Sequence, residues 1–154
     1  MTVGILLAPD STRMPRVPVV AVLNTNDDIV EMLRTLLEQA GHVVVSAHLD
    51  AIRRGEQSLV DFLEEHDPEL VVYDLVPPYD RSWRFLEHLS GTPAMRGRKF
   101  IITSTNAART KEIIGDVAHV YEIVGKPYDI DQIVNAVRGA LGGGSELPPN
   151  AKRA

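Results

Sequence analysis

Short apolar runs alternate along the chain with segments in which apolar residues recur every three or four positions. The first such segment has apolar residues at positions 29, 32, 33, 36, 37 and 40, the spacing of one face of an amphipathic helix. Gly41 follows it, as expected where a helix ends. The continuous runs predict strands, and they are Val17–Leu23, Val43–Val45, Leu70–Tyr73, Phe100–Ile102 and a run within Val117–Val124.

Four more helices are predicted between and after these strands. They are a segment around Leu59–Leu63 that ends near Asp67–Pro68, then Ser82–Leu89, Asn106–Ile114, and a segment that begins at the capping box of Asp129 and Gln132 and ends near Leu141. Strands that alternate with helices form a parallel sheet, because right-handed crossovers place the helices over its two faces. The predicted fold class is therefore α/β, a doubly wound five-stranded parallel sheet.

The two ends of the chain lack these periods. Residues 1–16 show no sustained pattern and are predicted to form an N-terminal arm. Residues 142–154 are rich in glycine and proline and are predicted to form a flexible C-terminal tail. Residues 17–141 remain as one domain, long enough to bury a core.

Composition narrows the classes of partner. The formal net charge of −5 is unlike the basic surface that dominates nucleic-acid binding. No apolar run approaches the ~20 residues that a membrane helix needs, so we expect neither nucleic acid nor membrane as a partner. The chain has no cysteine, which excludes disulfides and thiolate chemistry and favours a cytoplasmic location. Its five histidines show no metal-ligand spacing.

Polar residues follow four of the predicted strands, at the sheet edge where doubly wound folds bind ligands. They are Asn24–Asp28 after the first strand, Asp74 after the third, Thr103–Thr105 after the fourth and Lys126 after the fifth. An acid at the tip of a buried strand is costly unless it has a cationic partner or a function, and Lys126 can be that partner. A carboxylate, a hydroxyl and an ammonium at one edge suit phosphoryl transfer, with the carboxylate as nucleophile.

Three segments carry a resemblance to the receiver domains of response regulators. Pro68–Asp74 with Pro78 resembles the phosphoacceptor segment, Val124–Ile130 the fifth-strand Lys-Pro motif, and Asn24–Ile29 the first loop. The resemblance implies a flavodoxin-like strand order 2-1-3-4-5, a phosphate on Asp74 and a salt bridge from Lys126. It also implies a hydroxyl that reports phosphorylation, which is Ser104 in an ungapped alignment and Thr105 with a one-residue gap.

The same resemblance implies a magnesium site, from which the sequence departs. The ligands would be Asp74, the backbone carbonyl of Val76, and the first-loop positions Asn24 and Thr25, which hold acids in typical receivers. Magnesium prefers charged oxygen ligands, so this set is atypical. Asp27 and Asp28 either replace the missing acids or simply occupy the first turn of a helix capped by Asn26, the interpretation that we favour. Ile123 takes the place of the usual switching aromatic, with Tyr121 expected on the same strand face.

The resemblance implies a signalling protein rather than an enzyme. A stand-alone response regulator would receive phosphate from a histidine kinase or phosphotransfer protein, at most catalysing its own phosphorylation and dephosphorylation at Asp74. It would act by binding a downstream target protein, and such receivers often form homodimers. The alternative is a pseudo-receiver, an interaction module that is not phosphorylated in a magnesium-dependent way.

Two other hypotheses concern the surroundings of Asp74. An aspartyl phosphohydrolase or a flavin carrier is disfavoured, because Val76 stands where the former keeps a second acid and the first loop lacks the latter's phosphate-binding pattern. Tyr79, Arg81 and Trp83 either form a partner surface at the rim of the site or, for Trp83, belong to the core.

Overall fold

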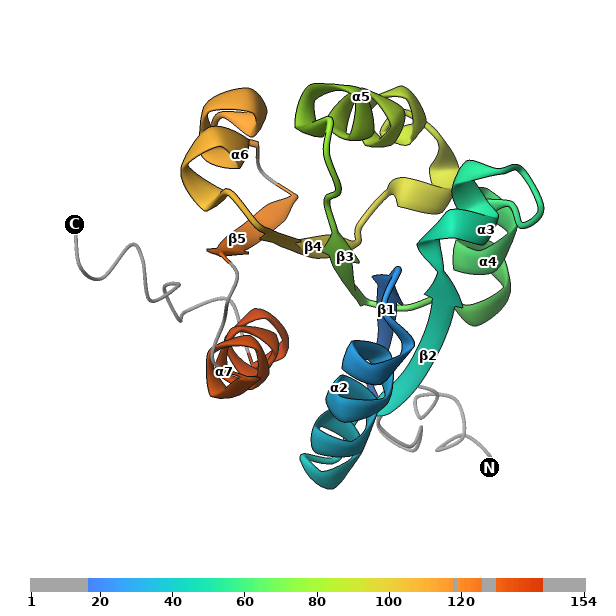
Figure 1. Cartoon of the computed structure of the whole chain (residues 1–154). Helices are drawn as coiled ribbons and strands as arrows, with labels where there is room; N and C mark the ends of the chain where they lie inside the picture. The colour runs from blue at the N-terminus through green and yellow to red at the C-terminus, as the bar shows by residue number, and fades with distance from the viewer. Residues whose placement is uncertain (1–16, 118, 126–129, 143–154) are drawn as a thin grey trace, which may run out of the picture.

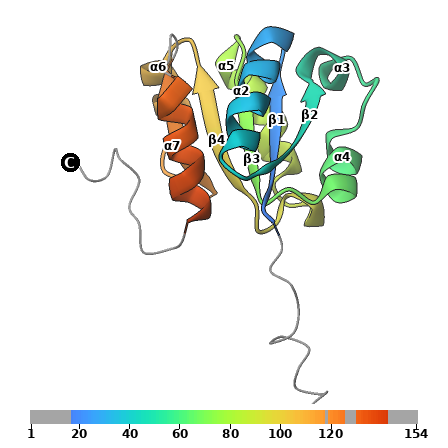
Figure 2. The ribbon, with the colours of Figure 1, turned by 90° about the horizontal axis from the view of Figure 1, so that it is seen from below.

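The protein, described here by a computed structural model over residues 17–117, 119–125 and 130–142, is built on one parallel sheet (Figure 1). The strand order is β2-β1-β3-β4-β5, which confirms the predicted fold class and order. The strand arrows point the same way (Figure 2), so their carboxyl ends form one edge. The strands are β1 (Val19–Asn24), β2 (Val43–His48), β3 (Leu70–Asp74), β4 (Lys99–Ser104) and β5 (Val120–Gly125).

Helices cover both faces of the sheet. Two of them, α2 (Asp27–Gln39) and α7 (Ile130–Leu141), lie on one side in Figure 1. The other side carries α3 (Leu49–Arg53), α4 (Leu59–His66), α5 (Tyr79–Leu89), a 3₁₀ turn η1 (Pro93–Met95) and α6 (Ala107–Ile114). The predicted set of five helices is therefore incomplete. It lacks α3, which lies before α4, and η1, which lies after α5, because both are too short to show a helical period.

Each face of the sheet has its own apolar core. Val20, Val22, Val72 and Ile101 pack on one side with residues of α2 and α7. Tyr73, Phe100 and other side chains of the strands pack on the opposite side with α3 to α6. Leu70–Asp74 is buried at every position, as expected for the central part of a parallel sheet covered on both faces.

Local capping explains where α2 begins. The Asn26 side-chain oxygen accepts hydrogen bonds from the backbone N–H groups of Asp28 at 2.9 Å and Ile29 at 3.2 Å. Asp27 and Asp28 occupy the first turn, where the helix dipole favours negative charge. The capping interpretation is confirmed, and Gly41 follows the helix with a φ of 98° that a glycine adopts without strain.

An irregularity in β5 corrects the expected position of Tyr121. The pairing between β4 and β5 shifts register where Phe100 faces Val120 and Ile101 faces Glu122. A bulge of this kind adds one residue and breaks the simple alternation of faces. Tyr121 consequently packs against the α2/α7 core, whereas Ile123 packs against the opposite one. The prediction that the two share a strand face is wrong.

Several predictions concern residues outside the described part of the chain. They are the arm at 1–16, the tail after residue 142, Lys126 with its Lys-Pro peptide, and the Asp129 half of the capping box. The domain boundaries at 17 and 141 stay predictions. Among the described residues, no helix is both long and apolar enough to cross a membrane.

Trp83, the single tryptophan, stacks on a histidine. Its ring stacks on that of His119, with centroids 6.2 Å apart and an interplanar angle of 15°. Burial lowers the pKa of His119 below its usual 6.5, because the buried ring favours the neutral form. The folded state therefore binds this proton less readily than the unfolded state. Stability contributed by neutral His119 is present above pH 6.5 and is lost as the pH falls from there to the folded-state pKa.

We therefore expect the tryptophan fluorescence to titrate with a midpoint below that of a free histidine, because an imidazolium stacked on indole quenches its emission. His119→Gln should abolish this titration. His42, whose pKa is also lowered by burial and by Arg138, is the control: His42→Gln should leave the fluorescence titration unchanged. An unchanged titration in His119→Gln would contradict the assignment.

Candidate functional site

Asp74 ends β3 in a nearly closed environment. It is 2% exposed, and in the sheet register it lies opposite Thr103 of β4. The Thr103 hydroxyl donates a hydrogen bond of 2.7 Å to Asp74 Oδ1. The next backbone group, the N–H of Leu75, donates to the Thr103 carbonyl at 2.8 Å. The acid is thus held at the carboxyl edge of the sheet by its neighbouring strand, and a hydroxyl lies within reach of anything bound to it.

The hydroxyls of Ser104 and Thr105, which the sequence indicated as reporters of phosphorylation, form hydrogen bonds with residues other than Asp74. Ser104 is fully buried, and its hydroxyl pairs with that of Thr110 at 2.7 Å and accepts the Asn106 N–H at 3.1 Å. Thr105 is hydrogen-bonded through its hydroxyl to the hydroxyl of Tyr79. Adjacent strand residues point to opposite faces, so Thr103 and Ser104 cannot both face Asp74. The structure places Thr103 on the acid, while a role for Ser104 or Thr105 in reporting phosphorylation stays a prediction.

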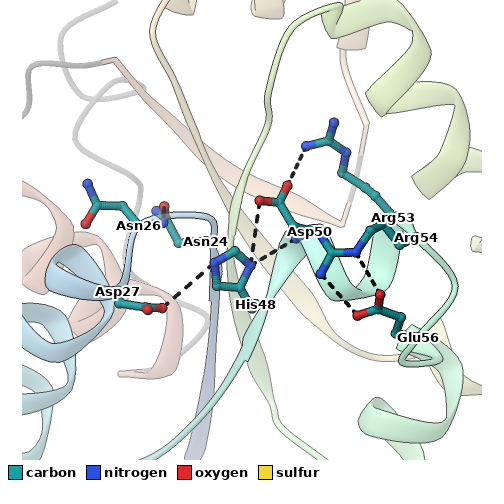
Figure 3. A network of polar contacts seen from close by, with 8 residues as sticks. All are labelled: Asn24, Asn26, Asp27, His48, Asp50, Arg53, Arg54 and Glu56. Carbon is teal, nitrogen blue, oxygen red and sulfur yellow. Dashed lines mark hydrogen bonds and ion pairs between the residues drawn. The ribbon is translucent and has the colours of Figure 1, made fainter.

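The end of β1 offers polar groups but no charge. Asn24 is 4% exposed, and its side-chain oxygen accepts the Asn26 N–H at 2.9 Å. Thr25 is partly buried. The Asp27 side chain is 86% exposed and lies beside His48, with 3.9 Å between Oδ1 and Nε2 (Figure 3). Because β2 and β3 flank β1 on opposite sides, an acid beside His48 is on the side of β1 away from Asp74.

His48 begins a polar network that positions α3 (Figure 3). Its Nδ1 accepts the Asp50 N–H at 3.1 Å and caps the helix, which requires that nitrogen to be unprotonated. Asp50 in turn pairs with Arg53 at 3.1 Å. This network sets the direction in which α3 presents Arg53, a residue that the sequence analysis did not select.

The four ligands that the resemblance implies for magnesium carry little negative charge. Asp74 is the only carboxylate among the four ligands that the resemblance implied, and it already accepts a hydrogen bond from Thr103. The Val76 carbonyl accepts the Ser82 hydroxyl at 2.5 Å, and the Asn24 oxygen accepts a backbone N–H. Within the described residues, no group of three or more histidines and acids is placed to hold a metal. Proteins bind Mg²⁺ through one or two carboxylates together with the substrate phosphate, and these residues supply only the lower number, so they fit a magnesium site poorly.

A pocket of about 280 Å³ opens beside Asp74. Within the part of the chain that the structure describes, its lining includes two cations, Arg53 from α3 and Arg81 from α5, and one acid, Asp74. Arg81 is exposed and forms no hydrogen bond or ion pair with the rest of the described chain. Burial raises the pKa of the Tyr73 phenol, so this ring enters the pocket in its neutral form. The remaining lining residues are Leu49, Val76, Pro77, Pro78, Ser82 and Phe85.

The rim residues considered from the sequence divide between surface and core. Arg81 lines the pocket, and Tyr79 is partly buried against Thr105. Trp83 is buried in the core beneath α5, which confirms the core interpretation for that residue. The pocket therefore lies between α3 and α5 rather than over the first loop.

The fold that carries this site is similar to that of several solved structures. A response regulator from Thermotoga maritima has a TM-score of 0.65 at 19% identity, over 83% of this chain and 100% of the other. The chain has the fold of a signal receiver domain. The receiver domain of an HD domain-containing protein from Pseudomonas fluorescens Pf-5 has a TM-score of 0.65 at 17% sequence identity, over 82% of this chain and 96% of the other. The chemotaxis response regulator CheY4 of Vibrio cholerae has a TM-score of 0.60 at 14% sequence identity, over 82% of this chain and 100% of the other.

The likeness lies in the structure and not in the sequence. No protein-family model matches the chain, and no curated protein matches it in sequence. The receiver fold nevertheless spans nearly the whole of the compared chains, so its carboxyl edge, with Asp74 at the end of β3, is the part of this molecule in which to look for function.

Proposed function

We propose that this protein is a response-regulator receiver that accepts phosphate on Asp74 and signals by binding another protein. The observation that supports it is the buried Asp74, held by the Thr103 hydroxyl and lining a cationic pocket at the carboxyl edge of a receiver fold. A histidine kinase or phosphotransfer protein in the cytoplasm would be the donor. A similar receiver domain from Clostridium thermocellum is described as part of a two-component histidine kinase system.

In phosphoryl transfer the protein mainly positions the reacting groups and stabilises their charge. An Asp74 carboxylate oxygen attacks the phosphorus of a phosphohistidine, the new P–O bond forms as the P–N bond breaks, and the imidazole leaves with the electron pair. The Thr103 hydroxyl, at 2.7 Å from the acid, is available to a phosphoryl oxygen. Lys126, outside the described residues, remains our candidate for the ammonium partner. The output is a binding event on the surface and not a second chemical reaction.

A second candidate function is that of a pseudo-receiver that keeps the fold for binding alone. The observation that favours it is the first loop, where Asn24 and Thr25 replace the acids expected there. Such a protein would bind its target whether or not a phosphoryl donor is present.

Phosphorylation by phosphoramidate separates the two functions. The full chain is incubated with the reagent in parallel samples with magnesium chloride and with EDTA, and its intact mass is measured. We expect the mass of one phosphoryl group to be added in at least one of the two samples. Asp74→Asn should gain none, because its amide is not a nucleophile. Asp80→Asn, which changes an exposed acid on α5, should behave as the unmodified chain does.

The outcomes are distinct. A folded protein that gains no phosphoryl group in either sample would favour the pseudo-receiver. A phosphoryl group that persists in Asp74→Asn would assign the modification to another residue and contradict the proposal.

A further inference from the structure

The pocket beside Asp74 brings positive charge to the place where a phosphoryl group would be attached. Arg53 and Arg81 reach it from two helices, α3 and α5, that are far apart in the sequence. Among the described residues that line it, Asp74 is the only one with a negative charge. Arg53 is already paired with Asp50 outside the lining, so Arg81 is the cation that this pocket holds in reserve among the described residues.

A phosphoryl group on Asp74 needs that charge. It carries close to −2 at neutral pH, and a charge taken out of water is costly unless it is paired. The first loop offers no cation and no metal-binding acid near Asp74, since Asn24 is neutral and Asp27 lies beside His48. The Val76 carbonyl, which accepts the Ser82 hydroxyl, brings no net charge. Among the described residues, the cations placed to compensate this charge are the arginines that line the pocket.

Arginine is suited to this task. Its planar guanidinium can donate two parallel hydrogen bonds to a phosphate and keeps its charge at any physiological pH. An arginine also stabilises the charge that spreads over the equatorial oxygens during phosphoryl transfer. Arg81 has no partner among the described residues that it would have to leave. Arg53 is held by Asp50 at 3.1 Å and so approaches from a fixed direction.

We propose that Arg81, assisted by Arg53, neutralises the phosphoryl group on Asp74, so that the protein accepts phosphate without magnesium. This inference rests on the proposed function and specifies how its site works. With phosphoramidate as donor, the Asp74 oxygen forms a P–O bond, the P–N bond breaks and ammonia leaves with the electron pair. Both guanidinium groups remain protonated throughout and donate hydrogen bonds to the phosphoryl oxygens.

The test compares rates of phosphorylation in EDTA for matched arginine variants. We expect the unmodified chain to be phosphorylated in EDTA at a rate close to that in magnesium chloride. Arg81→Gln should slow the reaction by about tenfold or more, the scale of one lost charge-assisted hydrogen bond. Arg81→Lys should recover part of the rate. Arg84→Gln is the control, because Arg84 lies on the same helix but pairs with the exposed Asp80 at 3.3 Å.

Circular dichroism of each variant verifies that α5 is still folded, as expected for substitutions of exposed residues. Phosphorylation that strictly requires magnesium and is insensitive to Arg81→Gln would overturn the arginine proposal and leave the phosphoacceptor function intact. Phosphorylation in EDTA with equal rates for Arg81→Gln and Arg84→Gln would also overturn it. The absence of any phosphorylation, with or without magnesium, would overturn the proposed function and this inference together.

Discussion

Replacing Trp83 with alanine is expected to lower the free energy of unfolding by about 3–5 kcal/mol, the usual cost of deleting a large buried aromatic ring. Trp83 is 4% exposed and stacks on His119. With Leu86 it makes up the buried face of α5, and no side chain caps the start of that helix. This ring is the largest side chain that α5 buries in the core. Loss of the ring should loosen the helix that carries Arg81 and the pocket wall.

Urea denaturation followed by far-ultraviolet circular dichroism measures this effect, since the variant has no tryptophan to report by fluorescence. The matched control is Phe85→Ala, an aromatic residue two positions along the same helix that is 38% exposed. Its substitution should cost less than that of Trp83, because its ring is already partly exposed to solvent. Equal losses in the two variants would mean that Trp83 does not anchor α5 and would revive its interpretation as a partner surface.

Arg98→Ala is expected to cost about 3 kcal/mol, because a largely desolvated cation with several partners is removed at once. The Arg98 side chain is 10% exposed. Its guanidinium donates to the Asp67 carboxylate at 2.9 Å and to the Pro68 carbonyl at 2.7 Å. It also donates to the carbonyls of Leu63 at 3.2 Å and Ala94 at 2.5 Å. One side chain thus joins the end of α4, the turn before β3 and the turn η1.

The control for Arg98 lies two residues away. Arg96 is exposed and has no hydrogen bond or ion pair within the described chain, so Arg96→Ala should change the free energy of unfolding by no more than about 0.5 kcal/mol. Arg98→Lys should be intermediate, because an ammonium cannot reach four acceptors in a plane. Denaturant midpoints for the three variants test the order. A midpoint for Arg98→Ala equal to that of Arg96→Ala would show that the network contributes nothing.

The sheet could be predicted from the sequence because its strands are buried on both faces. A strand such as Leu70–Asp74 is then apolar at successive positions and is readily seen between polar segments. The predicted runs fall within or overlap all five observed strands. The helix α3 could not be predicted, because five residues from Leu49 to Arg53 do not complete enough turns to show a period.

The site was only partly predictable, for a reason of geometry. Asp74 could be found because an acid at the end of an apolar strand is unusual in itself. Thr103 was passed over in favour of its neighbours because the partner of Asp74 depends on the register between β3 and β4, which neither strand encodes alone. Arg53 was missed because it reaches the pocket only through the placement of α3.

The strand order also has a consequence for how the chain assembles during synthesis. β1 pairs with β2, the next strand in the chain, and then with β3, the strand after that. β4 next adds to the free edge of β3, and β5 to that of β4, so after β3 each strand joins in the order in which it leaves the ribosome. No strand needs to be inserted between two that have already paired. We expect the segment through β3 to form a partly ordered template onto which the second half of the protein folds.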